Sequence, residues 1–422
     1  MSNPTVAMND KMPWRFICAL FFGQIANVMV IVVPMMLLLT FKFNALTPDS
    51  VKENFGLTAG ISTIAVIVFG PMLSSYTDKL TIAFGRRRTA ILAGGILGGI
   101  SLMAISYSSQ VWMIIVSWCC VQVFYSIVAS SIFALVPEQI SESRRGIVSG
   151  AMGIFAPASV IIGMMIMMSM TDRALELKFA TVAGIGLVAA LIVCMLIKEG
   201  PVPQRVKQEK KSILKKALHF YPNPFVHPSF SWGVSTRFFQ FLCGSTMPFQ
   251  TIYLMEKFHY TEAQVTTAMG MLSIIGPVLM AISSIGGGWL SDKLRKQKVL
   301  VIGSALGSAV GILLLVFATS FTGVIISTIV MSLSSGVYLA VDMALITRIL
   351  PSKEDFAKDA AIMNIAGQLP NSVTGFIAPP LIAAGGYPIL FGVFAIFGVL
   401  SALSVIPIPE MGVKNEQAKC SM

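Results

Sequence analysis

Long apolar runs almost free of charge, each close to the length of one bilayer crossing, constrain this chain more than any other feature. A helix that crosses about 30 Å of hydrocarbon needs about 20 mostly apolar residues. Single runs of that kind occupy residues 16–40, 57–77, 147–170, 179–197, 230–255 and 263–290. With 55% hydrophobic and 12% charged residues and a mean hydropathy of +0.80, the 422-residue chain cannot bury this surface in a water-soluble core. The sequence predicts an all-α integral membrane protein.

Three longer runs must each hold two helices, because each exceeds one crossing and contains a polar or glycine-rich break. The breaks fall at residues 107–110, 319–323 and 385–388. The total is twelve transmembrane helices. The first is a span and not a cleavable signal peptide, since its apolar run is too long and no small-residue cleavage pattern follows before Lys42.

The longest polar segment, residues 200–228, lies midway along the chain and contains PVPQRVKQEKKSILKK. We interpret it as a cytoplasmic linker between two six-helix bundles. Its SILKKAL portion is either solvated or a short helix on the membrane surface. The predicted domains are residues 1–199, 200–228 and 229–410, followed by a cytoplasmic tail at 411–422.

Lysine and arginine fall mostly on one side when the loops are assigned alternately to the two faces of the membrane. The opposite side holds only Lys42, Lys52, Arg173, Lys178 and Lys257. The positive-inside rule therefore predicts that both termini lie in the cytoplasm. We expect the protein to be located in the plasma membrane. The same asymmetry accounts for the net charge of +11. The positive charge therefore does not indicate a nucleic-acid partner.

Cysteine and histidine spacing argues against metal or catalytic chemistry. The six cysteines show no CxxC or Cys/His pattern, and the three histidines, His219, His227 and His259, are not at metal-ligand or catalytic spacing. No GxxxxGK[ST] phosphate loop occurs either. We expect a monomeric protein without a cofactor that is neither an enzyme nor a nucleotide-driven pump, and whose partners are the bilayer and a small molecule.

A turn with an aspartate followed by clustered bases occurs once in each half. GPMLSSYTDKLTIAFGRRR begins at Gly70, and GGGWLSDKLRKQKVL begins at Gly286. A second pair, ALVPEQISESRRG from Ala134 and ALITRILPSKEDFAKD from Ala344, supports an internal duplication. Parallel halves around a central cavity are the architecture of alternating-access carriers.

On these motifs the chain resembles the major facilitator superfamily, whose signature after the second helix is a glycine, an aspartate and a basic cluster. The long loop from Asp78 to Arg88, and the segment MNIAGQLPNSVTGFIAPPL from Met363, are similar to the glycoside-pentoside-hexuronide and sucrose-transporter-like group. The resemblance implies a cavity lined by the first, fourth, seventh and tenth helices.

The repeated turns have a physical rationale as well. An aspartate at the C-terminal end of a helix cannot be there to cap it, because that end repels anions. Asp78 and Asp292 are better placed facing helix N-termini of the opposite half, where the contacts would stabilise the outward-open state. The alternative is that these charges only fix topology. The predicted gating residues are Asp78, Arg86, Arg87, Arg88, Glu138, Glu142, Arg144, Asp292, Lys293, Arg295 and Arg348.

Polar side chains inside apolar helices are the candidates for the substrate cavity, because each costs free energy in lipid and normally faces a cavity or a partner helix. They are Gln24, Asn27, Trp118, Gln122, Tyr125, Gln240, Tyr338, Asn364 and Gln368, with Gln250 and Asn371 beside them. For any one of them, contact between helices is the alternative. As a set they suit a neutral polyhydroxylated ligand. An anion carrier should show more than one intramembrane cation, and Arg237 alone is expected to snorkel to the cytoplasmic surface.

Asp342 is the single acidic residue well inside a predicted span. It is either a proton site or an inner-gate partner of Arg144, Arg145 or Arg348, and we favour the gate. The absence of acidic residues from the first, second and fourth helices argues against sodium coupling. The sequence predicts a secondary transporter, most simply a proton-linked sugar or glycoside importer. The alternatives are a proton-linked multidrug or metabolite exporter and a flippase for a lipid-linked solute.

Overall fold

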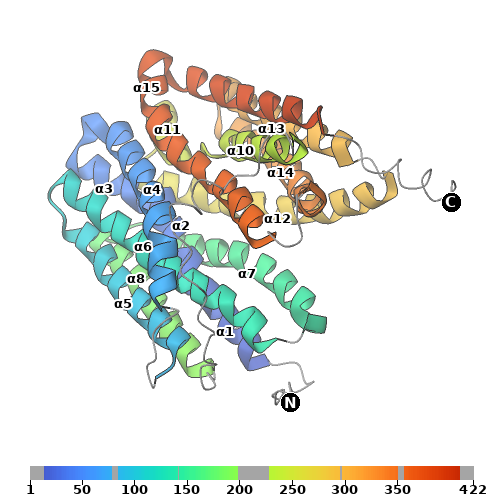
Figure 1. Ribbon diagram of the computed structural model, residues 1–422. Helices are drawn as coiled ribbons and strands as arrows, with labels where there is room; N and C mark the ends of the chain where they lie inside the picture. Colours follow the sequence, from blue (N-terminus) through green and yellow to red (C-terminus); the bar gives the residue numbers. More distant parts are fainter. Residues whose placement is uncertain are drawn as a thin grey trace, which may run out of the picture. The chain divides into compact units, whose positions relative to one another are not determined.

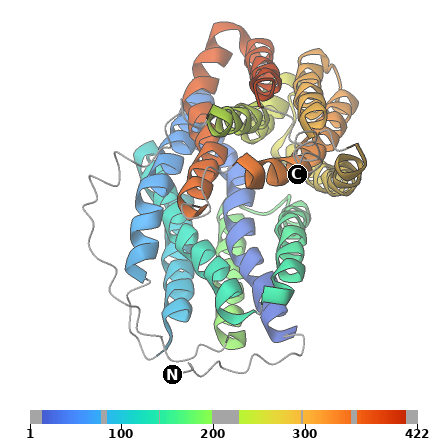
Figure 2. The same ribbon diagram turned by 45° about the vertical axis from the view of Figure 1, so that its right-hand side comes forward.

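The computed structural model describes residues 14–77, 84–140, 142–197, 228–294, 297–349 and 356–408. Every regular element in these ranges is helical (Figures 1 and 2). The chain divides into two compact units. The first comprises Met1–Arg205 with Leu254–Gly270, and the second comprises Val206–Tyr253 with Met271–Met422. Nearly all of the predicted linker lies outside the described residues.

The first unit begins with a long helical stretch that changes geometry twice. It runs through α1 (Trp14–Gln24), α2 (Val30–Val33) and α3 (Leu39–Leu46), joined by π-helical turns at Ile25–Met29 and Pro34–Leu38. Proline cannot donate a backbone hydrogen bond, so a change of helical geometry near Pro34 is expected. The helices that follow are α4 (Val51–Thr77), α5 (Arg86–Tyr107), α6 (Val111–Gln139), α7 (Glu142–Ser169) and α8 (Leu175–Leu196).

The rest of the chain continues with six helices. They are α10 (Pro228–Gly244), α11 (Gln250–Phe258), α12 (Glu262–Leu294), α13 (Gln297–Phe317), α14 (Phe321–Ile349) and α15 (Phe356–Val405). The break between α10 and α11 contains a 3-10 turn at Met247–Phe249.

The number of crossings agrees with the sequence prediction. Ten helical stretches among the described residues are long and apolar enough to span a membrane. The last of them, Ile362–Val405, is two helices, since Gly385 and Gly386 have non-helical backbone and Gly386 has a φ of +73°. The interrupted pair α10 and α11 supplies the twelfth crossing. The breaks predicted at 107–110 and 385–388 are confirmed, and the fold is all-helical with twelve spans in the described ranges.

Many hydroxyl side chains inside the spans donate to a carbonyl of their own helix. Thr58 Oγ1 donates to the Asn54 carbonyl at 2.6 Å, and Ser159 Oγ donates to the Phe155 carbonyl at 2.8 Å. Bonding to the carbonyl four residues earlier removes an unpaired polar group from the apolar interior. Such residues therefore contribute to the helix and are not evidence of a binding site.

Close helix contacts in the first unit rest on small residues. Helices α4, α5 and α6 run beside one another (Figures 1 and 2), and α8 packs on α5. The Tyr125 ring of α6 leaves no room at two neighbouring glycines. A methyl group at Gly98 would lie 2.4 Å from its ring, and one at Gly186 would lie 2.8 Å from its hydroxyl oxygen. Glycine at these positions lets the helices approach closely enough to bury the tyrosine completely.

In the second unit, α15 packs along α10 and α13, and α13 packs along α14. An aromatic cluster forms part of this packing. Tyr253 donates to the Leu315 carbonyl at 2.9 Å, and its ring lies 5.0 Å from that of Tyr387 and 5.2 Å from that of Phe391. Edge-to-face contacts of this kind add to the burial of the rings. The interior of this unit is thus fixed by aromatic packing as well as by aliphatic side chains.

Candidate functional site

A buried ion pair forms the centre of the candidate site, in the second unit. Asp342, about two turns before the end of α14, is 3% exposed and accepts a hydrogen bond from the Arg237 guanidinium of α10. Tyr338, one turn before Asp342, donates its hydroxyl to the other carboxylate oxygen at 3.2 Å. Both carboxylate oxygens therefore have donors. The three side chains form one connected polar network inside a membrane span.

Arg237 is held from three sides. Its guanidinium lies 5.1 Å from the centre of the Phe241 ring, one turn along α10. On the side of α15 it lies against Gly367, where a methyl group would come within 3.3 Å of Nε. The Nε atom is buried and makes no hydrogen bond with the described residues. The cation is therefore placed by packing as much as by its charge partner.

The prediction that Arg237 snorkels to the cytoplasmic surface is wrong. Its side chain is only 12% exposed and pairs with Asp342 inside the bundle. The residue lies nine positions after the start of α10, about 14 Å along a helix, which is far for its side chain to reach the surface. A buried carboxylate within reach is the better partner, because a charge left unpaired in lipid is costly.

The partner that the structure describes for Asp342 is one that the sequence analysis did not name. We considered Arg144, Arg145 and Arg348, but the side chains of all three lie outside the described residues. Among the described residues, the cation paired with Asp342 is Arg237, and pairing with those three stays a prediction. The two residues are 105 positions apart, yet they are charges of opposite sign inside spans of the same half. That complementarity was the signal in the sequence that could have identified the pair.

A stripe of amide side chains runs along α15 beside this pair. Asn364, Gln368 and Asn371 are all exposed. Asn364 and Asn371 lie three residues before and four residues after Gly367, so they share its face of the helix. Exposed amides on a membrane span are costly unless they meet water or a ligand. This face is therefore suited to line an aqueous path next to Arg237.

Two other predicted cavity residues of the second half are engaged in packing. Gln240 is 6% exposed and donates to Ser308 of α13 at 3.0 Å, while its Oε1 atom makes no hydrogen bond with the described residues. Gln250 at the start of α11 is 5% exposed. The structure thus groups Tyr338 and Asp342 with Arg237, and turns Gln240 toward α13.

The five candidates of the first half divide into buried and half-buried positions. Trp118 and Tyr125 are fully buried in α6, and Gln24 at the end of α1 is 5% exposed. Asn27 and Gln122 are half-buried. Stacking of a ligand on Trp118 or Tyr125 would require these rings to be uncovered. Asn27 lies in the first π-helical turn, where the side-chain period differs from the 3.6 residues assumed in placing it on one face with Gln24.

Most predicted gating residues cannot be placed. Asp78 and Arg295 lie outside the described residues, as do the side chains of Glu138, Glu142, Arg144, Asp292 and Arg348. Of the basic cluster after Asp78, Arg87 is buried, and Arg88 donates to the Ile197 carbonyl at the end of α8. Gly85, with a φ of +106°, immediately precedes α5. Lys293 lies 4.9 Å from the Trp289 ring. The latch function of the turns stays a prediction.

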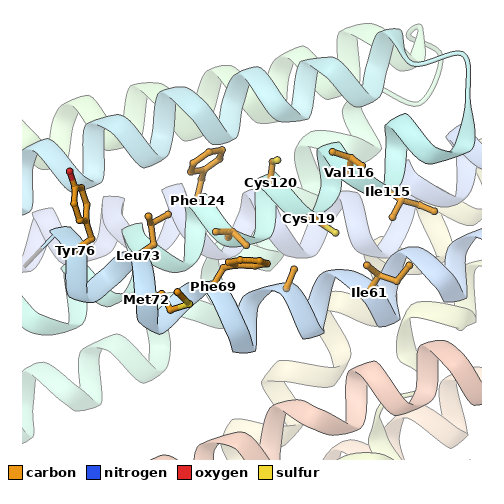
Figure 3. Close-up of a pocket in the computed structure, with 12 residues that line it drawn as sticks. Ile61, Phe69, Met72, Leu73, Tyr76, Ile115, Val116, Cys119, Cys120 and Phe124 are labelled. Atoms are coloured by element: carbon orange, nitrogen blue, oxygen red, sulfur yellow. The ribbon is translucent and has the colours of Figure 1, made fainter. Parts of the chain in front are cut away.

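A surface groove in the first unit lies between α4 and α6, with a volume of about 650 Å³ (Figure 3). Its lining includes Ile61, Phe69 and Met72 from α4 and Val116 and Cys119 from α6. Almost no polar atom faces it. Both helices are candidate spans, and an apolar groove on them suits the bilayer interior better than a polar solute. We therefore place the candidate site at Arg237 and Asp342.

Comparison with known proteins supports the membrane-carrier architecture. The family model described as Major Facilitator Superfamily matches residues 15–284 and 235–420. A nucleoside transporter structure, NupG, superimposes with a TM-score of 0.73 at 11% identity, covering 93% of this chain and 99% of that one. A bacterial homolog of the human lysosomal transporter Spinster, inward-facing and occupied, gives 0.70 at 14% identity, covering 97% of each chain. These two likenesses concern the fold.

A probable anion transporter of Arabidopsis thaliana chloroplasts, anion transporter 6, is 34% identical over 121 residues. The match spans 28% of this chain and 23% of that relative. The glycoside-pentoside-hexuronide group suggested by the sequence is not singled out by these comparisons. The family model covers both halves of the chain, and the folds it resembles are those of transporters. The chain belongs to the Major Facilitator Superfamily and is a membrane transporter, not an enzyme.

Proposed function

We propose that the protein is a proton-coupled secondary carrier that moves a small polar solute across the cytoplasmic membrane by alternating access. It works as a monomer with both termini in the cytoplasm, and proton and solute move in the same direction. The observation that carries this proposal is the Asp342 network: a carboxylate inside a span, buried with Arg237 and Tyr338. The latch function of the Asp78 and Asp292 turns remains part of the proposal.

A buried carboxylate in a span is expensive, so its presence calls for a function. A buried ion pair adds little to stability relative to apolar residues of the same size. Proton coupling gives Asp342 such a function, because a carrier needs a group that loads and releases the ion during each cycle. Pairing of Asp342 with Arg237 of its own unit favours the proton site over the inner gate, since a gate would need a partner from the opposite half.

A sugar or glycoside is the substrate class that the amide stripe supports. Asn364, Gln368 and Asn371 offer both donors and acceptors, which match hydroxyl groups without adding charge. The sequence likeness of the long Asp78 loop to sugar carriers favours the same class. Export of drugs or metabolites against protons, and flipping of a lipid-linked solute, have no comparable support among the described residues.

An organic anion is the second candidate, and two observations favour it. Arg237 is a buried cation inside a span, which the sequence prediction had assigned to the membrane surface. The 121-residue relative is named as a probable anion transporter. A guanidinium is the side chain best suited to bind a carboxylate with two parallel hydrogen bonds.

Uptake by purified protein in proteoliposomes tests the proposal. Sugars, sugar acids and cationic dyes are offered with and without an acid-outside pH gradient. We expect accumulation of a sugar or sugar acid only when the gradient is imposed. Transport of dyes without any sugar or acid, or accumulation of a solute that ignores the pH gradient, would contradict the proposal.

A further inference from the structure

We propose that Arg237 and Asp342 form an exchange site, at which a carboxylate of the solute replaces Asp342 on the guanidinium when a proton neutralises Asp342. The solute class is then a polyhydroxylated monocarboxylate, that is, a sugar acid. This inference rests on the proposed proton-coupled transport and makes it specific. A single ligand of this class would contact both the Arg237 guanidinium and the amide stripe of α15.

The first step concerns charge. In the paired state the Arg237 cation is neutralised by Asp342, and the network carries no net charge. A proton on Asp342 alone would leave Arg237 as an uncompensated cation in a side chain that is only 12% exposed. Removing one member of a buried ion pair is strongly unfavourable. A solute carboxylate restores neutrality, so proton and anion are expected to load together.

The second step concerns competing partners. Arg237 on α10 and Tyr338 on α14 are the ionisable side chains described in contact with Asp342. Asp359 of α15 is the other buried carboxylate of this unit in the described ranges. It lies eight residues before Gly367, about 12 Å along the helix, too far to replace Asp342 on Arg237. Among the described residues no other buried carboxylate of this unit can replace it, and an incoming anion is the candidate that remains.

The third step concerns space. Gly367 has no side chain, and a methyl group there would lie 3.3 Å from Nε and 3.6 Å from Nη2 of Arg237. The guanidinium therefore lies directly against α15, and its buried Nε has no described hydrogen-bond partner. Nε and Nη2 are the two donors that a carboxylate can accept side by side. The edge of the guanidinium next to α15 therefore carries a donor that Asp342 does not use, and a carboxylate can reach it only when Arg237 moves away from Gly367.

The fourth step concerns the rest of the ligand. Asn364 and Asn371 flank Gly367 on the same face of α15, and both are exposed. A molecule whose carboxylate meets Arg237 at Gly367 would present its remaining atoms to these amides. Amide groups donate to and accept from hydroxyls. A carboxylate on a polyhydroxylated body fits both parts of the site.

The site also fixes the charge balance of transport. One proton is bound by Asp342 and one anion is bound by Arg237, so the loaded site has the same net charge as the empty one. The pair of ligands carries no net charge across the membrane. Uptake of the acid should therefore depend on the pH gradient and not on the membrane potential.

Binding measurements that do not depend on transport test the inference. Purified protein in weakly buffered solution with a pH indicator is titrated with hexuronic and aldonic acids, each paired with its neutral sugar. We expect at least one acid to bind with uptake of about one proton for each molecule bound. Its neutral partner should bind about tenfold more weakly or worse, and without proton uptake.

Two double variants separate this site from general effects. In Arg237→Gln/Asp342→Asn the pair is neutral, so the acid should lose its advantage over the neutral sugar and proton uptake should vanish. In Lys52→Gln/Glu256→Gln a different ion pair, at the surface of the first unit, is neutralised by the same chemistry. That control should retain both the preference and the proton uptake.

Several results would overturn the inference. They are binding of a neutral sugar as tight as its acid, binding of an acid without proton uptake, unchanged behaviour of Arg237→Gln/Asp342→Asn, and absence of binding by every acid in the panel. If a neutral sugar is accumulated by the pH gradient, the inference fails while proton-coupled transport stands. If the gradient drives no solute at all, the proposed function fails as well.

Discussion

Two ion pairs in this protein have the same chemistry and opposite surroundings. Lys52 and Glu256 meet at 3.1 Å in the first unit, with side chains 27% and 39% exposed. Arg237 and Asp342 pair in the second unit with side chains 12% and 3% exposed. Exposed pairs contribute about 0.2–1 kcal/mol and are screened by salt. Losing one member of a buried pair costs about 3–5 kcal/mol.

The difference shows why only one pair is a candidate for function. The exposed pair can be lost or gained with little effect on folding, so its presence needs no further reason. The buried pair contributes no more than apolar residues would, yet losing either partner is costly. A network that is expensive to break and unnecessary for stability is best explained by the transport cycle. The predictions below separate the two pairs.

The largest effect is expected for Asp342→Asn, because it leaves Arg237 as a buried unpaired cation. We expect a loss of about 3–5 kcal/mol in the free energy of unfolding and no proton-driven uptake. Thermal unfolding of the purified protein and uptake in proteoliposomes measure the two. As the matched control, Arg237→Gln/Asp342→Asn should recover most of the stability without recovering the proton-driven uptake. If Asp342→Asn alone were as stable as the wild type, the pair would not be buried as described.

Tyr338→Phe comes next, since it removes the hydroxyl that donates to Asp342 at 3.2 Å. A hydrogen bond to a charged group contributes about 1.5–3 kcal/mol. Tyr253→Phe is the matched control, because its hydroxyl donates to a neutral backbone carbonyl at 2.9 Å and should cost about 0.5–1.5 kcal/mol. Chemical unfolding of both variants gives the comparison. Equal losses would mean that Asp342 does not carry the charge assumed.

A smaller effect is expected for Gly367→Ala, whose methyl group would lie 3.3 Å from Arg237 Nε. Arg237 must shift by a few tenths of an ångström, so we expect a two- to tenfold weaker apparent affinity for the solute, equivalent to about 0.4–1.4 kcal/mol. Beyond the break at Gly385 and Gly386, Gly392→Ala meets nothing within 4 Å and should leave the affinity unchanged. Concentration dependence of uptake measures this. Identical behaviour of the two variants would remove Gly367 from the site.

The smallest effect belongs to the exposed pair. A double-mutant cycle of Lys52→Ala and Glu256→Ala should give a coupling energy below about 1 kcal/mol that falls further in high salt. The substitutions should not change proton-driven uptake by more than about twofold. A large coupling energy that resists salt would place this pair in the same class as the buried one and would end the contrast.

The sequence predicted the helices well because their causes are local. Spans follow from apolar length, and the interruption at Gly385 and Gly386 follows from two glycines before a tyrosine and a proline. The break between α10 and α11 was missed, because the run from 230 to 255 has the length of one span and its turn is marked only by Gly244, two hydroxyl residues and Pro248. The π-helical turns near Pro34 were missed for a similar reason, since composition does not reveal helical period.

The candidate site was predicted in part. Asp342 and Tyr338 stood out because polar side chains in a span are rare. Their partner did not, since pairing Arg237 with a residue 105 positions away depends on how α10 and α14 are rotated. Gly367 gave no chemical signal at all, because its contribution is the space that it leaves for Arg237. The rotation of α10 and α14 and the space beside Gly367 both depend on tertiary packing. Such packing cannot be read from the residue pattern of a single sequence.

The central claim is that Asp342 carries the coupled proton, and one measurement tests it most directly. Proteoliposomes with wild-type protein or with Arg237→Gln/Asp342→Asn are loaded with solute for counterflow and, separately, exposed to an acid-outside gradient. We predict that the double variant retains counterflow at saturating solute but shows no accumulation driven by the gradient, whereas the wild type shows both. Accumulation by the double variant at the wild-type level would contradict the account, because the proton would then be carried elsewhere.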